Sequence, residues 1–500
     1  METSDWNPHF EMPTLAEIED DLALGSASWR SLLADAQPSA VPAARSTRAI
    51  VIGGSMAGLL AARVLSEHFA EVHVIERDRL PDGPEFRNGV PQSRHAHALL
   101  RAGLDVLDRL FPGFSNELEG AGAVPVEPPL DLPWFNSAGW SGRFDAGLGI
   151  LCSSRELTES LVRRRVLAIS NVSFRTRTEV LGLIAQQGQV SGVKVRPRDE
   201  SRPDSSQEFN LEADFVVDAS GRASRTPEWL EQLGYERPSE VTINSHLAYA
   251  SRLFCPPQRR FDWKGLLIGS TPEAPRGGIV VPIEGGRWLV TLAGYGRENQ
   301  PPIDEAGYLE FAQSLRTPAL FNAIRDAAPA GRIYGYARTQ NVRRHFELLT
   351  QRPEGLIVVG DATCSFNPIY GQGMSVAGLE ALAVSACLRQ SPNGGVDGLA
   401  TQAQRAIASV CTDAWLLATG EDLRYPTTEG GTGHARPIDR AVQKYINRVI
   451  RCSNQDLTVC RAFTRVMHLL DPPAALFRPS VVARVLLNRV RDGGPEPATT

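Results

Sequence analysis

The sequence lacks the features of several protein classes. Its seven cysteines are odd in number and scattered, without the short paired spacings of disulfide scaffolds or metal sites. No apolar stretch reaches the ~18 residues that a membrane-spanning helix needs. The acidic N-terminus has neither the basic nor the apolar region of a signal peptide, and there are no internal repeats. We therefore expect a soluble, cytoplasmic protein.

The sequence also lacks a concentration of positive charge. The formal net charge is -5, and lysine and arginine are spread along the chain rather than gathered in a stripe. A nucleic-acid partner is therefore not expected. The 500 residues, 42% hydrophobic and 22% charged, are typical of a globular chain. That length accommodates roughly two to four domains and an enclosed active site.

Residues 1–45 are predicted to form an extension ahead of the main fold. Thr14 and Glu17 occupy capping-box positions, which predicts a short helix. Residues 37–44 (Gln-Pro-Ser-Ala-Val-Pro-Ala-Ala) are typical of a linker. An extension without a role is an equal alternative.

The first motif with a chemical meaning begins after the apolar run 49–52. A glycine-rich turn, a helical stretch and a second apolar run at 72–75 predict a strand-helix-strand unit of a parallel sheet. In such a unit the turn and the helix N-terminus face a pyrophosphate, and an acidic residue such as Glu76 binds ribose hydroxyls. Because Ser55 replaces the second glycine of the fingerprint, FAD, NAD and an incidental turn stay open. The turn residues expected to bind are Gly53, Ser55, Met56, Ala57 and Gly58.

The second motif lies about 300 residues later. Asp361 follows the strand-like run 356–359, and the glycine-rich loop 368–374 (Pro-Ile-Tyr-Gly-Gln-Gly-Met) opens a helix. An aspartate at a strand end can bind the ribitol hydroxyls of a flavin, and the positive end of a helix stabilises the negative charge of reduced flavin. Together the two motifs are far more specific for a flavin dinucleotide than either alone. The loop residues expected at the ring are Pro368, Gly371, Gly373 and Met374.

A third element, residues 218–225 (Asp-Ala-Ser-Gly-Arg-Ala-Ser-Arg), follows another strand. It resembles the Asp-Gly fingerprint of flavoprotein hydroxylases, which contacts FAD and is linked to NAD(P)H use; Asp218 and Gly221 carry the likeness. With all three motifs the chain resembles class A flavin monooxygenases of the para-hydroxybenzoate hydroxylase fold, from about residue 48 to about residue 490. Residues 89–97 (Gly-Val-Pro-Gln-Ser-Arg-His-Ala-His), 360–361 and 367–374 look most like the bacterial polyether epoxidase branch.

The resemblance implies an α/β fold with a Rossmann-like FAD-binding domain of the glutathione-reductase type, a β-sheet substrate domain and a helical C-terminal region. The FAD-binding domain would comprise residues 46–235, with an inserted segment at about 120–150, and residues 346–395. Residues 236–345 would form the substrate domain and 396–500 the helical region. Between residues 173 and 220 we expect a β-meander with a turn at 188–192, and at 278–292 a hairpin in a separate sheet over the active site.

Carried over by position, Arg77, Arg94 and Arg155 would also hold FAD, and Val180 would lie near its adenine. A surface arginine on an amphipathic helix is the alternative for Arg155. His95 and His97 are spaced for one face of a strand, but no third metal ligand of fitting spacing is present, so packing is preferred and no metal is expected. Cys364 could attach a flavin covalently, although a small buried residue is the favoured interpretation.

The function implied by the resemblance is that of an FAD-dependent monooxygenase using NAD(P)H and O2. It would epoxidise or hydroxylate a hydrophobic small molecule, for example a polyketide or terpenoid olefin of secondary metabolism. No catalytic acid or base is nominated, because the cofactor carries the hard chemistry. The alternatives are a flavin-dependent reductase, a halogenase, whose Trp-x-Trp-x-Ile-Pro signature is absent, and a flavin-binding sensor. The amphipathic, basic segment 477–490 would pack on the FAD domain or dock on a membrane.

Overall fold

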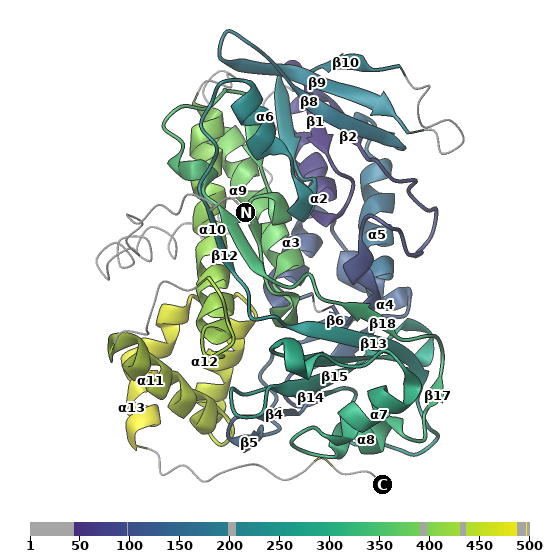
Figure 1. Ribbon diagram of the computed structural model, residues 1–500, viewed down its shortest axis with the longest axis vertical. Helices are drawn as coiled ribbons and strands as arrows, with labels where there is room; N and C mark the ends of the chain where they lie inside the picture. The colour runs from purple at the N-terminus through teal and green to yellow at the C-terminus, as the bar shows by residue number, and fades with distance from the viewer. Residues whose placement is uncertain are drawn as a thin grey trace, which may run out of the picture.

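The computed structural model describes residues 45–97, 99–198, 207–390, 398–430, 437–487 and 497. The helix expected after Thr14 and the linker at 37–44 lie outside the described residues. The predicted fold class is confirmed: a parallel sheet with helices on one face, a second sheet and a helical C-terminal region (Figure 1).

A five-stranded parallel sheet forms the centre of the first part of the molecule. The second half of strand β1 is apolar, and both of its faces are covered: Ala49 and Val51 join the core beneath the helices, whereas Ile50 and Ile52 join the core on the opposite face. All four pairings are parallel, so the segments that follow the strands meet at one edge. In sheet order the strands are β20 (Leu356–Val358), β11 (Phe215–Asp218), β1 (Arg45–Ile52), β2 (Phe69–Ile75) and β7 (Val172–Arg175).

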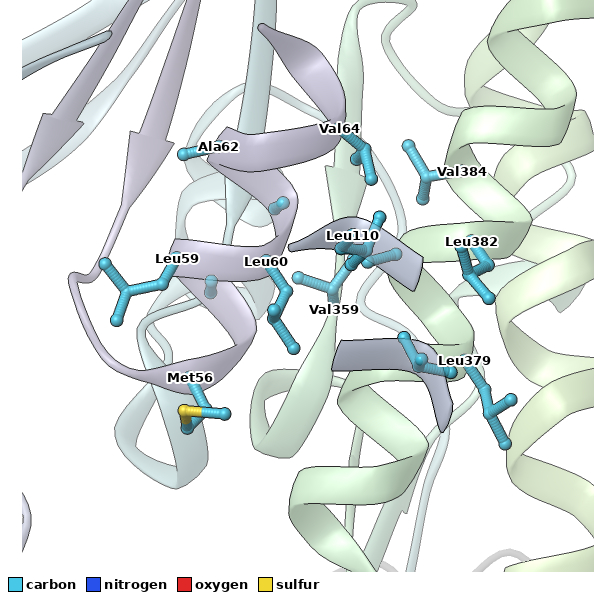
Figure 2. Packing of buried hydrophobic residues seen from close by; sticks show 14 of the residues in the cluster. Met56, Leu59, Leu60, Ala62, Val64, Leu110, Val359, Leu379, Leu382 and Val384 are labelled. Carbon is cyan, nitrogen blue, oxygen red and sulfur yellow. The ribbon is translucent and has the colours of Figure 1, made fainter. Parts of the chain in front are cut away.

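Helices cover one face of this sheet. Figure 2 shows Leu60 and Val64 of one helix turned toward Leu382 and Val384 of another, with Leu110 between them, and all five side chains are buried. This packing needs apolar residues three and four apart on each helix, which the sequence supplies. The helices of this layer are α2 (Met56–Leu65), α3 (Arg101–Leu110), α4 (Phe114–Gly120), α5 (Arg155–Leu167), α9 (Gly373–Gln390) and α10 (Leu399–Asp422).

A three-stranded antiparallel sheet covers the other face, at the top of Figure 1. It consists of β8 (Thr178–Gln186), β9 (Gln189–Pro197) and β10 (Phe209–Glu212), beside α6 (Thr226–Gln232). The predicted turn at 188–192 is wrong in its extent. Gln187 and Gly188, with φ of 52° and 81°, complete a two-residue hairpin turn, so β9 already begins at residue 189.

A second, eight-stranded sheet lies at the other end of the molecule (Figure 1). The predicted hairpin is confirmed: Gly285 and Gly286 turn between β15 and β16 with φ of 72° and 64°. Residues 134–140 of the predicted insertion supply two of its edge strands. Its strands are β17 (Ala328–Pro329), β13 (Ala248–Cys255), β16 (Arg287–Gly294), β15 (Arg276–Ile283), β14 (Leu266–Ile268), β4 (Trp134–Asn136) and β5 (Gly139–Trp140), with β18 (Tyr334–Tyr336) paired to β13. Helices α7 (Glu305–Gln313) and α8 (Ala319–Ile324) pack on it.

Two small sheets join these parts. One has the order β12 (Glu240–Ile243), β19 (Asn341–Arg344), β21 (Cys364–Ser365), and the other pairs β3 (Val124–Val126) with β6 (Ile150–Cys152).

The C-terminal helices α11 (Pro437–Ser453), α12 (Leu457–Met467) and α13 (Pro479–Leu487) share a core of their own. Helix α13 packs on α11 and α12 through Val481 and Val485, rather than on the FAD domain. The three helices reach the second sheet through stacking of Trp134 on Phe463, whose ring centroids are 6.0 Å apart. Among the described helices, none combines the length and apolar character required to cross a bilayer.

Candidate functional site

The turn between β1 and α2 can be built only with glycine at two positions. Gly53 has a φ of 103°, and a Cβ there would lie 2.5 Å from the carbonyl oxygen of Ala219. A Cβ on Gly58 would lie 1.8 Å from the carbonyl oxygen of Gly53. Ser55 precedes the first residue of α2, but its side chain does not cap the helix. The first turn of α2 therefore has no side-chain cap, as an anion-binding helix N-terminus requires.

The Ser55 hydroxyl instead belongs to a buried group of charged residues. It donates to Glu159 Oε2 at 2.9 Å and accepts from Arg155 Nη2 at 3.1 Å. Glu159 is also paired with Arg155 at 2.8 Å and with Arg87 at 3.0 Å. Burial raises the pKa of Glu159, but Arg155 and Arg87 together outweigh burial and hold the pKa below its usual value.

Glu76 ends β2 next to the same turn. Its Oε2 accepts from the backbone N–H of Gly54 at 2.8 Å and forms an ion pair with Arg87 at 3.3 Å, while its Oε1 accepts from the N–H of Asp78. The carboxylate therefore lies beside the glycine turn, in the position from which a ribose would be reached.

The second motif packs directly against the first. Gly360 has a φ of 62°, and a Cβ there would lie 2.7 Å from the Cβ of Ala57 in the first turn of α2. Asp361 follows, half-buried; burial raises the pKa of its carboxyl, and Arg222, Arg155 and Arg344 act in the opposite direction. Two segments about 300 residues apart thus meet at the edge of the parallel sheet, as binding of one dinucleotide at both places requires.

The glycine loop continues from Asp361 to the start of α9. A Cβ on Gly373, the first residue of α9, would lie 3.9 Å from Asp361 Oδ1, so the carboxylate faces this helix end. Gly371 adopts the left-handed conformation with a φ of 65°. Pro368 begins a short 3-10 turn, and Met374 is partly exposed in the first turn of α9.

Among the described residues, two buried polar atoms beside these motifs have no hydrogen-bond partner. One is Nη1 of Arg155, whose side chain is 6% exposed, and the other is Oε1 of Gln372, which is 1% exposed. An unpaired buried donor or acceptor costs about 1–3 kcal/mol, so both atoms are placed as ligand contacts would be. A guanidinium N–H near the pyrophosphate turn and an amide oxygen near the ring loop match the chemistry of FAD.

The other predicted site residues are distributed around this edge. Asp218 is fully buried, and its oxygens accept from Ser220 N, Ser224 Oγ and Thr226 Oγ1, so the side chain holds its own turn. Gly221 follows with a φ of 81°. Val180 is buried on β8, which begins with a hydrogen bond from Thr178 to the carbonyl of Glu76.

Arg77 is exposed at the end of β2. The Arg94 guanidinium lies between two aromatic rings, 3.5 Å from the centroid of Phe86 and 4.0 Å from that of Tyr334. Cys364 is buried in the hydrophobic core.

His95 is buried and His97 is half-buried, and the ring of each is hydrogen-bonded. Nδ1 of His95 lies 2.7 Å from Ser251 Oγ, and Nδ1 of His97 lies 2.9 Å from the carbonyl oxygen of His95. Burial lowers the pKa of His95 to about 3 and that of His97 to about 4, so both are neutral near pH 7. In the part of the chain that the structure describes, no group of three or more histidine, cysteine, aspartate or glutamate side chains is placed to hold a metal ion.

An aromatic cluster from the second sheet adjoins the ring loop. Tyr249 and Tyr295 are buried in it, and Tyr295 stacks on Tyr425 with centroids 3.8 Å apart. The hydroxyls of Tyr295 and Tyr370 are 3.4 Å apart, which brings the second sheet to the loop that precedes α9. The ring of His95 lies against Tyr249 and Tyr336.

Sequence reasoning missed two members of the charged group, Arg87 and Glu159. The position of Glu159 four residues after Arg155 on a predicted helix was a usable signal, because such residues are neighbours on a helix surface. Arg87 lies in an irregular segment and gave no comparable signal.

Comparisons with known proteins find a matching family and a related sequence. A family model described as an FAD binding domain matches residues 46–397. Protein Rv3254 of Mycobacterium tuberculosis (strain ATCC 25618 / H37Rv) is 31% identical over 451 residues, covering 89% of this chain and 94% of that protein.

Two solved structures show the same fold at low identity. A probable FAD-dependent monooxygenase from Pseudomonas aeruginosa, pqsL, has a TM-score of 0.53 at 17% identity and covers 76% of this chain and 97% of its own. The myxobacterial chondrochloren halogenase CndH, an FAD-dependent enzyme, has a TM-score of 0.57 at 17% identity, covering 86% and 97%. The family match spans the glycine turn, Asp361 and the ring loop, and on this basis the chain belongs to the FAD binding domain family.

Proposed function

We propose that the protein is an FAD-dependent monooxygenase that uses NAD(P)H and O2 to epoxidise or hydroxylate a hydrophobic small molecule. The supporting observation is that the aromatic cluster of the second sheet meets the glycine loop at the Tyr295–Tyr370 contact. A substrate held by this sheet would therefore lie next to the flavin ring. When FAD is bound and reduced, it supplies the activation of O2.

The protein's own residues bind the cofactor and shape an apolar surface. The N-terminus of α2 and Arg155 would face the pyrophosphate, Asp361 the ribitol, and Gln372 with the start of α9 the ring edge. Burial raises the pKa of Tyr249 and of Tyr295 well above 10, so both stay uncharged. An uncharged aromatic cluster beside the ring loop would suit an olefin or an aromatic ring, and favours a polyketide or terpenoid substrate over a charged metabolite.

A halogenase is the second candidate, because CndH shares the fold. The sequence lacks the Trp-x-Trp-x-Ile-Pro signature of flavin-dependent halogenases, which favours the monooxygenase. A reductase of isoprenoid double bonds and a flavin-loaded sensor are the remaining alternatives.

The reaction is tested by incubating the enzyme with candidate olefins, NADPH and isotopically labelled O2, followed by mass spectrometry. One labelled oxygen atom in the product is expected. A halide-dependent product would indicate a halogenase, and a reduced product without oxygen would indicate a reductase. If no substrate and no NAD(P)H bleached the flavin, the sensor alternative would be favoured.

The position of the cofactor is tested by Asp361→Ala. This substitution removes the carboxylate expected on the ribitol, so the affinity for FAD should fall about tenfold or more. Titration of the purified apoprotein with FAD, followed by flavin fluorescence, measures the change. A variant that purifies with full yellow occupancy would contradict the placement of Asp361.

We also propose that the C-terminal helices contact an anionic lipid surface, from which a lipophilic substrate would be collected. Residues 437–487 contain eight lysine and arginine residues against three aspartates, although the chain as a whole carries -5. Phe477, Leu486 and Leu487 are 46%, 58% and 81% exposed on this basic part. Co-sedimentation with phosphatidylserine vesicles should be lost in the pair Leu486→Glu and Leu487→Glu, and unchanged sedimentation would refute the contact.

A further inference from the structure

A single buried carboxylate connects the last helix of the FAD layer to the ring loop. Asp422 is the final residue of α10 and is fully buried. Its oxygens accept hydrogen bonds from Nδ2 of Asn367 at 3.1 and 3.0 Å, from the hydroxyl of Tyr370 at 2.8 Å, and from Nδ2 of Asn341 at 2.7 Å. Two of these three donors belong to the segment that leads into the glycine loop.

The donors are themselves fixed by further contacts. Asn341, on β19, accepts through Oδ1 from the backbone N–H of Asn367 at 2.7 Å. Asn367 accepts through its own Oδ1 from the N–H of Ile369, which closes the short turn at Pro368–Tyr370. Asp422 therefore holds both ends of this turn, directly ahead of Gly371 and Gln372.

The Asp422 carboxylate does not stabilise α10 itself. A negative charge at the C-terminal end of a helix opposes the helix dipole, and removing a carboxylate from water is costly. Within the described residues, none of the ion pairs involves Asp422. Its stabilisation comes instead from neutral donors that lie outside α10, among them Asn367, Tyr370 and Asn341.

We infer that Asp422 is a positioning residue, which fixes the loop from Asn367 to Gln372 in the shape that binds the flavin ring and so couples α10 to the ring site. This inference rests on the proposed position of the ring at that loop. It extends the same coupling to the substrate sheet, because Tyr370 donates to Asp422 while its oxygen lies 3.4 Å from the hydroxyl of Tyr295.

The ionisation of Asp422 provides a second measurable consequence. Burial raises the pKa of Asp422, and hydrogen bonds from Asn367, Tyr370, Asn341 and Ser245 oppose the increase. A protonated carboxyl accepts fewer hydrogen bonds, so the loop should loosen and FAD affinity should fall as the pH decreases through this pKa. The titratable and charged groups that act on Asp422 or on its tyrosine neighbours are Tyr249, Tyr295, Tyr336, Tyr370, Tyr425, Glu421, Arg424 and Arg316.

The deciding experiment measures FAD binding by the full-length protein between pH 5 and 9, with the flavin absorption spectrum recorded at each point. Asp422→Asn keeps the shape but removes the charged acceptor. We expect about tenfold weaker FAD binding at pH 8, a shifted spectrum, and loss of the part of the pH dependence that the wild type shows. Glu310→Gln is the control, because Glu310 is exposed on α7, away from the Asp422 hydrogen bonds, and the variant should behave as the wild type.

Tyr370→Phe provides an independent test that does not change the carboxylate. It removes one donor to Asp422 and should weaken FAD binding in the same direction by a smaller factor, about threefold. If Asp422→Asn and Tyr370→Phe both keep wild-type affinity, spectrum and pH profile, the inference is wrong. If the variants behave as expected but no oxygenated product is ever formed, the proposed monooxygenase function fails and the coupling stands. A wild-type protein that binds no FAD would overturn both.

Discussion

The two ends of the candidate FAD site are built from different interactions. At the pyrophosphate turn, carboxylates and guanidinium groups form a buried ionic group in which Arg155 and Arg87 lower the pKa of Glu159. Around the ring loop, the buried carboxylates Asp422 and Glu380 are held mainly by neutral donors, and burial raises the pKa of both. The pyrophosphate end is thus stabilised by ion pairs. At the ring end, hydrogen bonds from neutral donors only partly offset the desolvation of the buried carboxylates.

The two ends should therefore respond differently to the loss of a partner residue and to a change of pH. A charged group tolerates burial only while every partner is present, so loss of one arginine should be severe. A buried carboxylate that accepts only from neutral donors has a raised pKa. Its contribution to stability and to FAD binding should therefore vary with pH rather than with the loss of any single ion pair.

The largest effect is expected from Gly58→Ala, which breaks the charged end by steric means. The new Cβ would meet the carbonyl oxygen of Gly53 at 1.8 Å, and because both atoms are fixed to backbone, the turn must move. We expect a loss of about 3 kcal/mol or more in the free energy of unfolding and loss of FAD binding. Denaturant titration measures the first effect and flavin fluorescence the second. Gly182→Ala on β8, where a Cβ meets nothing within 4 Å, should leave both unchanged.

The next effect is expected from Arg155→Met, which removes one partner of the ionic group. Glu159 would keep Arg87 but lose its 2.8 Å contact, so the free energy of unfolding should fall by about 3 kcal/mol, with weaker FAD binding. Arg164→Met is the control, because Arg164 lies on the same helix with its side chain 67% exposed and pairs with Glu117 at the surface. Equal stability of the two variants would show that the ionic group does not organise the turn.

The smallest effect is expected from Glu380→Gln, and it should depend on pH. Glu380 accepts from the backbone N–H of Gly360 at 2.6 Å, and burial raises its pKa from 4.5 to about 7. The pKa of Glu380 is higher in the folded than in the unfolded protein. Protonated Glu380 therefore contributes fully to stability below about pH 4.5, and this contribution is lost as the pH rises through about 7. Glu380→Gln should therefore be more stable than the wild type at pH 9, by about 3 kcal/mol at most, and similar at pH 5.

Thermal unfolding at the two pH values measures this difference. Glu310→Gln, at an exposed position on α7, is the control and should match the wild type at both. A pH-independent difference for Glu380→Gln would contradict the raised pKa. The charged end should respond in the opposite sense: the lowered pKa of Glu159 predicts that its contribution is lost as the pH falls into the acid range.

The accuracy of sequence reasoning also differs between the two ends. Gly53 and Glu76 directly follow strands, Asp361 lies three residues after β20, and Gly58 lies in the first turn of α2. The sequence pattern predicted all four near one edge of the sheet, because the ends of parallel strands meet there. Asp218, the last residue of β11, was predicted to be a cofactor residue from the resemblance of residues 218–225 to the Asp-Gly fingerprint. Its oxygens bind its own turn, and only the structure could reveal this, because the backbone conformation of residues 220–226 decides which donors reach them.

Asp422 gave no signal in the sequence. It stands 52 residues after Tyr370, at the end of a helix whose pattern predicts only packing against α9. Its role depends on the angle at which α10 crosses the layer and on the place where β19 begins, at Asn341, neither of which is encoded in a local motif.

By itself, the sequence determined the first strand-helix-strand unit, the hairpin at 278–292, the two glycine turns and the acidic residues near strand ends, because these depend on backbone conformation and on the periodicity of apolar residues. The tertiary structure alone decided which buried charges are paired with arginine and which with neutral donors. Such pairing depends on residues far apart in the chain being brought within hydrogen-bond distance, and the free energy of burying a charge is fixed only when all of its neighbours are in place.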